Sequence, residues 1–141
     1  MELKSFQRRV LEDLTFFLNN LQIESPELAF KKLWLERYGV DLEKETFKSF
    51  RYKSQKGIPL SACIKIPTGG GKTFVGVNAT KLILDKLPSD GINAVVWLVP
   101  SDTILKQTLE AFRNPLHPYR IKLSQLFGSV NVLSKEQLLQ G

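Results

Sequence analysis

The sequence predicts an α/β protein in which amino-terminal helices precede a domain built on a parallel sheet. Two observations lead to this fold class. In the first part of the chain apolar residues recur at three- and four-residue spacing, which is the period of an amphipathic helix. From Leu60 onwards, short apolar runs alternate with helical patterns, which is typical of a parallel sheet covered by helices.

The composition excludes several classes of protein. Apolar residues make up 43% of the 141 residues and charged residues 24%, as in a folded globular chain. No apolar run approaches the ~20 residues that span a bilayer, and the charged amino terminus lacks the core of a signal peptide. A single cysteine, Cys63, cannot form an internal disulfide, so the cytoplasm is the expected location. The net charge of +6 suits a nucleic-acid partner, although charge alone favours a solvated lysine-rich face.

Residues 1–57 are expected to form a helical amino-terminal segment. A first amphipathic helix should cover roughly residues 6–20, because one face of it would carry Phe6, Val10, Leu14, Phe17, Leu18 and Leu21.

A second helix is expected between Ser25 and Gly39. Ser25 can cap its start, and Pro26 suits the first turn, where its missing N–H group costs nothing. The helix should end near Tyr38, with Gly39 as a left-handed cap. A short helix around residues 42–50 and a basic loop should complete this segment.

Residues 58–141 are expected to hold the first part of the α/β domain. Three runs have the length and composition of buried strands, namely residues 62–66, 92–100 and 129–134. Helices should follow these strands: from Lys72 to about Leu87, from Ser101 or Asp102 through Phe112, and from Lys135, where Ser134 and Gln137 form a capping box.

The stretch "PTGGGKT", residues 67–73, lies between the first expected strand and its helix. Backbone N–H groups of such a loop converge on one point, and the helix N-terminus adds its positive dipole end, so the loop suits a phosphate. Gly69, Gly70 and Gly71 leave no side chain to block a pyrophosphate. Lys72 would face the β- and γ-phosphates, and the Thr73 hydroxyl would bind Mg²⁺, as in a Walker A motif. The alternative is a flexible glycine turn beside a surface lysine.

The strict Walker A pattern would place glycine at position 66, where this sequence has Ile66. The remaining pattern, P-T-G-x-G-K-T, resembles motif I of the superfamily 2 helicases and translocases. This resemblance implies an incomplete RecA-like P-loop NTPase domain with catalytic roles for Lys72 and Thr73 and with Thr73 as the Mg²⁺ ligand. It implies that ATP and Mg²⁺ are held by Pro67, Thr68, Gly69, Gly70, Gly71, Lys72 and Thr73.

Two other stretches resemble helicase motifs. "WLVPSDTILKQTLEAF" stands where these helicases carry motif Ia, which implies that Pro100, Ser101, Asp102 and Thr103 contact a nucleic-acid backbone. Ser101 as a helix cap alone is the other interpretation. "SFQRRVLEDL" resembles the helicase stretch whose glutamine reads adenine, which would make Gln7 a ligand of the base. A glutamine on an amphipathic helix is otherwise usually a polar surface residue.

Taken together, "FQRRVLEDL", "CIKIPTGGGKT", "VVWLVPSDTILKQTLEAF", "HPYR" and "VNVLSKEQLL" resemble the start of the helicase-like restriction (Res) subunit of type III restriction enzymes. The resemblance implies an ATP-dependent DNA helicase or translocase of a restriction system. It also implies duplex DNA as a partner, a methyltransferase (modification) subunit as another, and a nuclease domain in the whole protein.

Hydrolysis in this family needs an Asp-Glu pair after a hydrophobic strand, and the sequence contains no such pair. We therefore expect residues 58–141 to be a RecA-like domain truncated before Walker B, the amino-terminal part of a longer protein and inactive alone. The alternatives are a stand-alone, non-catalytic nucleotide-binding module and an RNA helicase with the same core. ATP binding without hydrolysis would favour the first, and ATPase activity stimulated by RNA the second.

Overall fold

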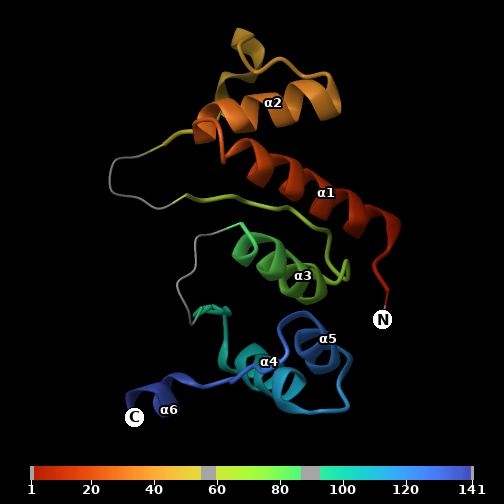
Figure 1. Ribbon diagram of the computed structural model, residues 1–141, viewed down its shortest axis with the longest axis vertical. Coiled ribbons are helices and arrows are strands. Elements are labelled where there is room, and N and C mark those ends of the chain that lie inside the picture. The colour runs from red at the N-terminus through yellow and green to blue at the C-terminus, as the bar shows by residue number, and fades with distance from the viewer. Residues whose placement is uncertain (1, 55–59, 87–92, 141) are drawn as a thin grey trace. The chain divides into compact units, whose positions relative to one another are not determined.

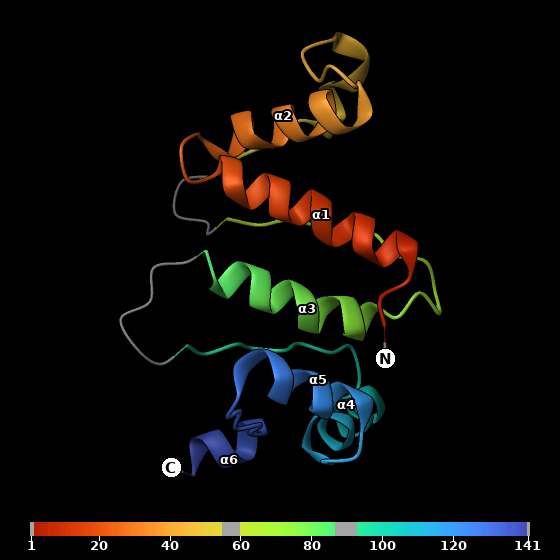
Figure 2. The ribbon, with the colours of Figure 1, turned by 45° about the vertical axis from the view of Figure 1, so that its right-hand side comes forward.

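The computed structural model describes residues 2–54, 60–86 and 93–140, and it divides into two compact units, Glu2–Val75 and Gly76–Gly141 (Figures 1 and 2). Helix α3 contributes residues to both units. The elements in chain order are α1 Ser5–Asn20, α2 Pro26–Tyr38, the 3₁₀ helix η1 Glu45–Phe50, α3 Lys72–Leu84, α4 Asp102–Arg113, α5 Pro118–Phe127 and α6 Lys135–Leu139. In the described ranges, no helix is long and apolar enough to cross a lipid bilayer.

The predicted parallel sheet is not present in the residues that the structure describes, so the α/β, RecA-like fold class predicted from the sequence is wrong. The segments expected as strands, residues 62–66, 93–100 and 129–134, have non-helical backbone without strand pairing. Ile92, the first residue of the second expected strand, lies outside the described residues. Val96 and Leu98, expected inside a sheet, are 82% and 87% exposed.

The reason is that strand propensity is local, whereas a sheet needs hydrogen-bonding partners from distant segments. Side chains supply such partners to the segment 129–134. The carbonyl of Val130 accepts a hydrogen bond from Arg120 at 3.0 Å, and that of Val132 accepts one from Arg113 at 3.1 Å. Guanidinium groups on two helices thus occupy carbonyls that a neighbouring strand would otherwise use.

Helices α1 and α2 pack on each other in the amino-terminal unit and lie side by side in both views (Figures 1 and 2). The predicted first helix is confirmed as α1, and its spacing places one apolar stripe in the core: Leu11, Leu14, Phe17 and Leu18 are all buried.

The predicted ends of the second helix are also confirmed in α2. The Ser25 hydroxyl accepts a hydrogen bond from the Leu28 N–H group at 3.3 Å, and Pro26 occupies the first turn. Gly39 ends the helix at a φ of 67°, a conformation that glycine adopts without the steric cost of a side chain.

The helix expected over residues 42–50 is shorter than predicted and is the 3₁₀ helix η1. The Asp41 carboxylate accepts a hydrogen bond from the Glu43 N–H group at 3.0 Å, which favours a turn over a helix at that point. Leu42 is buried beside this turn, and Arg51 donates to the carbonyls of Leu42 and Glu43.

Aromatic rings join the two helices to the chain that follows them. Phe30 packs edge-on to Phe17 with centroids 6.3 Å apart and lies 5.9 Å from the ring of Tyr52. The Tyr52 hydroxyl accepts a hydrogen bond from the Ser61 N–H group at 3.2 Å. The chain is therefore anchored near the carboxyl-terminal half of α1 before residues 61–66 lead to the glycine loop.

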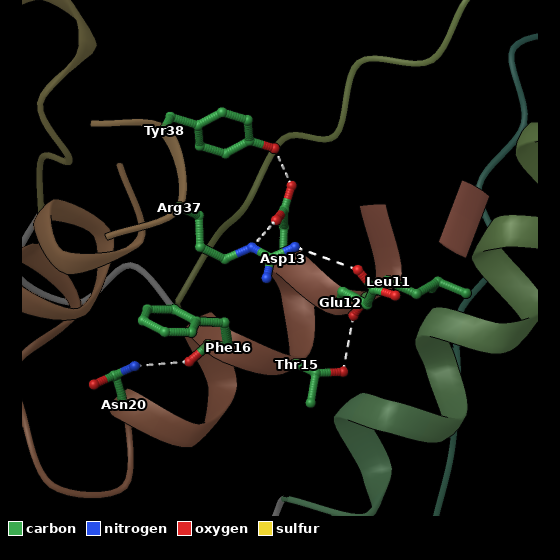
Figure 3. A network of polar contacts seen from close by, with 8 residues as sticks. All are labelled: Leu11, Glu12, Asp13, Thr15, Phe16, Asn20, Arg37 and Tyr38. Atoms are coloured by element: carbon green, nitrogen blue, oxygen red, sulfur yellow. Dashed lines mark hydrogen bonds and ion pairs between the residues drawn. The ribbon is translucent and has the colours of Figure 1, made fainter. Parts of the chain in front are cut away.

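A polar network joins α1 to the end of α2 (Figure 3). Asp13 accepts hydrogen bonds from Arg37 Nε, at 2.5 Å, and from the Tyr38 hydroxyl. Arg37 also reaches Glu12, at 3.4 Å. The hydrogen bond to Asp13 raises the pKa of the Tyr38 hydroxyl, because the carboxylate accepts only from its protonated form. The bond to Asp13 raises the pKa of Arg37 for the same reason.

The carboxyl-terminal unit has its own core, formed where α3, α4 and α5 meet. Its buried members are Val77, Ala111, Phe112 and Leu123. Helices α4 and α5 pack on each other, and Trp97 meets Phe112 edge-on with ring centroids 5.3 Å apart. Trp97 thus anchors its part of the chain to this core, whereas the next residue, Leu98, is exposed.

Helix α5 did not follow from the sequence patterns, because its apolar residues do not form a clear stripe. Its start is nevertheless encoded locally. The His117 ring accepts a hydrogen bond from the Tyr119 N–H group at 3.2 Å, and Pro118 takes the first helical position. The stretch "HPYR" therefore begins a helix.

The predicted capping box at the start of α6 is confirmed. The Ser134 hydroxyl accepts from the Gln137 N–H group at 3.4 Å, and the Gln137 side chain accepts from the Ser134 N–H group at 3.0 Å. Helix α3 ends at Leu84, and Leu87, where it was expected to end, lies outside the described residues.

Candidate functional site

The three glycines of the loop are each required for a distinct reason. Gly69 and Gly71 have φ values of 74° and 72°, which residues with a side chain rarely adopt. A Cβ atom on Gly70 would lie 2.6 Å from Ile66 Cγ2 and 2.9 Å from the Pro67 carbonyl oxygen. The loop therefore excludes side chains at three successive positions, twice by backbone conformation and once by packing.

Residues 67–70 form a tight turn that leads into α3. The Gly70 N–H group donates to the Pro67 carbonyl at 3.0 Å, and the Val75 N–H group donates to the Gly71 carbonyl at 3.0 Å. Lys72 and Thr73 are the first residues of α3, so their N–H groups have no carbonyl one turn earlier within the helix. These amides and the helix dipole favour an anion in front of the loop.

Lys72 lies over the loop from which it emerges. Its side chain is exposed, and Nζ donates to the Pro67 carbonyl at 3.0 Å. The same carbonyl accepts the Gly70 N–H group, so it keeps one partner if the lysine moves to another anion. Thr73 is half-buried in the first turn of α3. Its hydroxyl is the single oxygen that sequence reasoning assigns to a metal ion.

Gln7 comes from the other end of the amino-terminal unit and reaches the loop directly. It lies on the first turn of α1 and is 4% exposed. Its Nε2 donates to the Gly70 carbonyl at 2.8 Å across 63 positions of sequence, and its Oε1 accepts from the Lys4 N–H group at 2.9 Å. The structure thus brings together Gln7 and the glycine loop, two features that sequence reasoning assigned to one nucleotide.

Three further residues shape this site. Ile66, which replaces the first glycine of the strict motif, is buried and fixes the space beside Gly70. The ring of Phe6 lies on the same side, 3.6 Å from where a Cβ of Gly70 would be. Lys4 precedes α1, and its N–H group donates to the Gln7 side chain at 2.9 Å.

The predicted nucleic-acid segment, residues 100–103, belongs to the carboxyl-terminal unit. Pro100 and Ser101 precede α4, and Asp102 and Thr103 are its first residues; all four are exposed. The Ser101 hydroxyl accepts a hydrogen bond from the Ile104 N–H group at 3.4 Å. Ser101 is therefore a helix cap, as one of the two interpretations had it, and its exposure leaves a contact with a phosphate open.

Carboxylates do not gather near either segment. Over residues 2–54, 60–86 and 93–140, no group of three or more His, Cys, Asp or Glu side chains is placed to hold a metal ion. The Thr73 hydroxyl fits a magnesium ion that is held together with oxygens of a bound phosphate, as Mg²⁺ commonly is in nucleotide sites.

Comparison with known proteins identifies the family of the chain. A family model described as "Type III restriction enzyme, res subunit" matches residues 1–137, which is nearly the whole chain. No curated protein and no solved structure matches the sequence.

Proposed function

Because the chain belongs to the family of the res subunits of type III restriction enzymes, we propose that residues 67–73 bind ATP with Mg²⁺ in an ATP-dependent DNA helicase or translocase. The observation that carries this proposal is the hydrogen bond between Gln7 and Gly70. It brings Gln7, which the family resemblance places at the nucleotide, to the loop expected to hold phosphate.

Different groups of the loop would bind different parts of the nucleotide. The N–H groups of Gly71, Lys72 and Thr73 would face the phosphates, and the glycines would admit them without obstruction. Lys72 would leave the Pro67 carbonyl, 3.0 Å away, for the β- and γ-phosphates. The Thr73 hydroxyl would bind Mg²⁺. When bound, the nucleotide supplies the phosphoryl group whose transfer to water drives movement along DNA.

The DNA partner is proposed from the family and from the exposed start of α4. Ser101, Asp102 and Thr103 present hydroxyl and amide groups at a helix N-terminus, where phosphate oxygens are bound favourably. A methyltransferase subunit as a second partner and a cytoplasmic location are proposed from the family alone.

The test of nucleotide binding is the Lys72→Ala variant, with binding of MgATP measured by calorimetry. Since hydrogen bonds to charged groups contribute about 1.5–3 kcal/mol, we expect affinity to fall by roughly 10- to 150-fold. Helix content should be unchanged, because Lys72 is exposed and its side chain bonds only to Pro67 among the described residues. Lys65→Ala, an exposed lysine on the approach to the loop, is the matched control. Equal affinity of Lys72→Ala and wild type would reject the loop as the site.

The same assay separates the proposed function from its alternatives. ATP bound by the chain, with turnover stimulated by duplex DNA in the whole protein, supports the translocase. Turnover stimulated by RNA instead would favour an RNA helicase. Binding without any turnover would favour a non-catalytic nucleotide-binding module.

A further inference from the structure

Gln7 is a buried amide whose two polar atoms are both engaged with the backbone. Oε1 accepts from the Lys4 N–H group at 2.9 Å and so caps the start of α1. Nε2 donates to the Gly70 carbonyl at 2.8 Å. An exposed residue reserved for a base would have both groups free, whereas Gln7 joins helix α1 to the glycine loop.

That hydrogen bond fixes the orientation of a whole peptide unit. The Gly70 carbonyl and the Gly71 N–H group belong to one planar trans peptide, in which the two bonds point in opposite directions. Because Gln7 holds the carbonyl towards α1, the Gly71 N–H group points away from α1. The Gly70 N–H group is held separately, by the Pro67 carbonyl at 3.0 Å.

Gly71 admits Gln7 because it has no side chain. A Cβ atom on Gly71 would lie 2.7 Å from Gln7 Nε2, so any other residue would displace the amide as well as strain a φ of 72°. The glycine and the glutamine are therefore complementary parts of one arrangement, which orients an amide of the phosphate-binding loop.

We propose that Gln7 is a positioning residue for phosphate: it aims the Gly71 N–H group into the anion site and acts on every phosphate ligand, with or without a base. This inference rests on the proposed function of the loop. It differs from adenine reading in what it predicts, because a base reader changes the preference for ATP over GTP and has no effect on a ligand without a base.

The test is Gln7→Glu, with magnesium tripolyphosphate, MgATP and MgGTP as ligands in calorimetry. The carboxylate keeps an acceptor for the Lys4 N–H group and presents a second acceptor to the Gly70 carbonyl, so the cap remains and the link to the loop is lost. Because the lost hydrogen bond is replaced by repulsion between two acceptors, we expect all three affinities to fall about tenfold. Gln22→Glu, an exposed position just beyond the other end of α1, makes the same charge change and should bind as wild type.

The outcomes distinguish the two proposals. Tripolyphosphate affinity of Gln7→Glu equal to wild type, with only the ATP-to-GTP ratio altered, would leave Gln7 a base reader and overturn the positioning role. If wild type binds neither tripolyphosphate nor ATP, the loop is not a phosphate site, and both proposals fail.

A second measurement does not depend on the variant folding. In wild type, tripolyphosphate bound at the Gly71 N–H group should polarise that peptide and strengthen its carbonyl as an acceptor, because linked hydrogen bonds are cooperative. The side-chain NH₂ resonances of Gln7 should therefore shift in the NMR spectrum on binding a ligand that has no base. Resonances that stay in place at saturating tripolyphosphate would overturn the positioning role.

Discussion

At the scale of single residues, Gly76 allows Trp97 to pack closely against α3 in the carboxyl-terminal core. A Cβ atom at this position would lie 2.5 Å from Trp97 Cη2 and 3.4 Å from two neighbouring ring atoms. Trp97 in turn packs edge-on against Phe112. The absence of a side chain on α3 thus lets the indole lie against the helix.

We expect Gly76→Ala to destabilise the carboxyl-terminal unit. Alanine gains about 1 kcal/mol of helix propensity over glycine, whereas forcing extra atoms into a packed site costs typically 1–3 kcal/mol, so overpacking prevails. Urea unfolding followed by Trp97 fluorescence, in a Trp34→Phe background, measures the difference. In a Trp97→Leu background the same substitution should become neutral or stabilising. Stabilisation by Gly76→Ala with Trp97 present would show that the indole does not constrain this position.

The sequence predicted those residues of the candidate site whose type itself suits nucleotide binding. The loop of residues 67–73 and Gln7 were identified from motif spacing. Ile66 and Lys4 were not, because one acts by filling space beside Gly70 and the other through its backbone. Many residue types could fill that space or donate through the backbone, so the type of the residue does not reveal either role. That Gln7 bonds to the Gly70 carbonyl also required the structure, since nothing local relates positions 63 apart.

At the scale of elements, two substitutions of Ser101 distinguish its role as the cap of α4 from its proposed contact with nucleic acid. Ser101→Ala removes the acceptor of the Ile104 N–H group and should cost about 1 kcal/mol of stability, measured by thermal melting. Ser101→Asp keeps a capping oxygen and should retain stability, but it places a negative charge where DNA phosphate is proposed to bind.

Ser101→Asp should therefore weaken DNA binding in fluorescence anisotropy, most clearly at low salt, where charges are least screened. Ser124→Asp, an exposed serine on α5, is the control for the change of charge. If both variants weaken binding equally, the effect is one of net charge, and the start of α4 is not a contact.

The stability of the packing between α1 and α2 should depend on pH, because the Tyr38 hydroxyl can ionise. Its pKa is raised by the hydrogen bond to Asp13, so the folded form holds this proton more tightly than the unfolded form. The stabilisation is therefore complete below about pH 10, the ordinary pKa of tyrosine, and is lost as pH rises through the raised value.

The measurement is the difference in melting temperature between wild type and Tyr38→Phe from pH 8 to pH 12. The difference should be constant up to about pH 10 and shrink above it. In an Asp13→Asn background the acceptor carries no charge, and the decline should be weaker. A difference that does not change over this range would contradict the role of the Tyr38–Asp13 bond.

At the scale of the whole molecule, most helices were predictable from the sequence, but α5 was not, and the predicted sheet was wrong. Both ends of α2 and the start of α6 follow from caps a few residues apart, since every helical hydrogen bond is local. A run such as residues 92–100 carries strand propensity, but pairing depends on a partner elsewhere in the chain. In the structure the described part of that run is anchored by Trp97 and leaves Val96 and Leu98 exposed.

Because Val96 is exposed, we expect the fold to tolerate a polar substitution there, whereas the same substitution in a buried strand would destabilise it. Val96→Lys should change the free energy of unfolding by no more than about 0.5 kcal/mol, as for an ordinary surface position. Val77→Ala, at a residue only 1% exposed, should cost roughly 1–3 kcal/mol. The far-UV circular dichroism spectrum should be dominated by helix. A large loss of stability in Val96→Lys would show that this segment is buried in solution.

The distance in sequence between Gln7 and Gly70 also bears on the order of folding. Closing a loop of 63 residues costs roughly 4 kcal/mol of chain entropy, more than one hydrogen bond of about 1 kcal/mol returns. The contacts of Tyr52 with Phe17 and Ser61 close most of that span first, leaving eight residues between Ser61 and Gly70. The glycine loop should therefore take its final shape late, on helices that have already assembled. In stopped-flow refolding, Phe17→Ala should delay the recovery of nucleotide binding, even though residue 17 is remote in sequence from the loop.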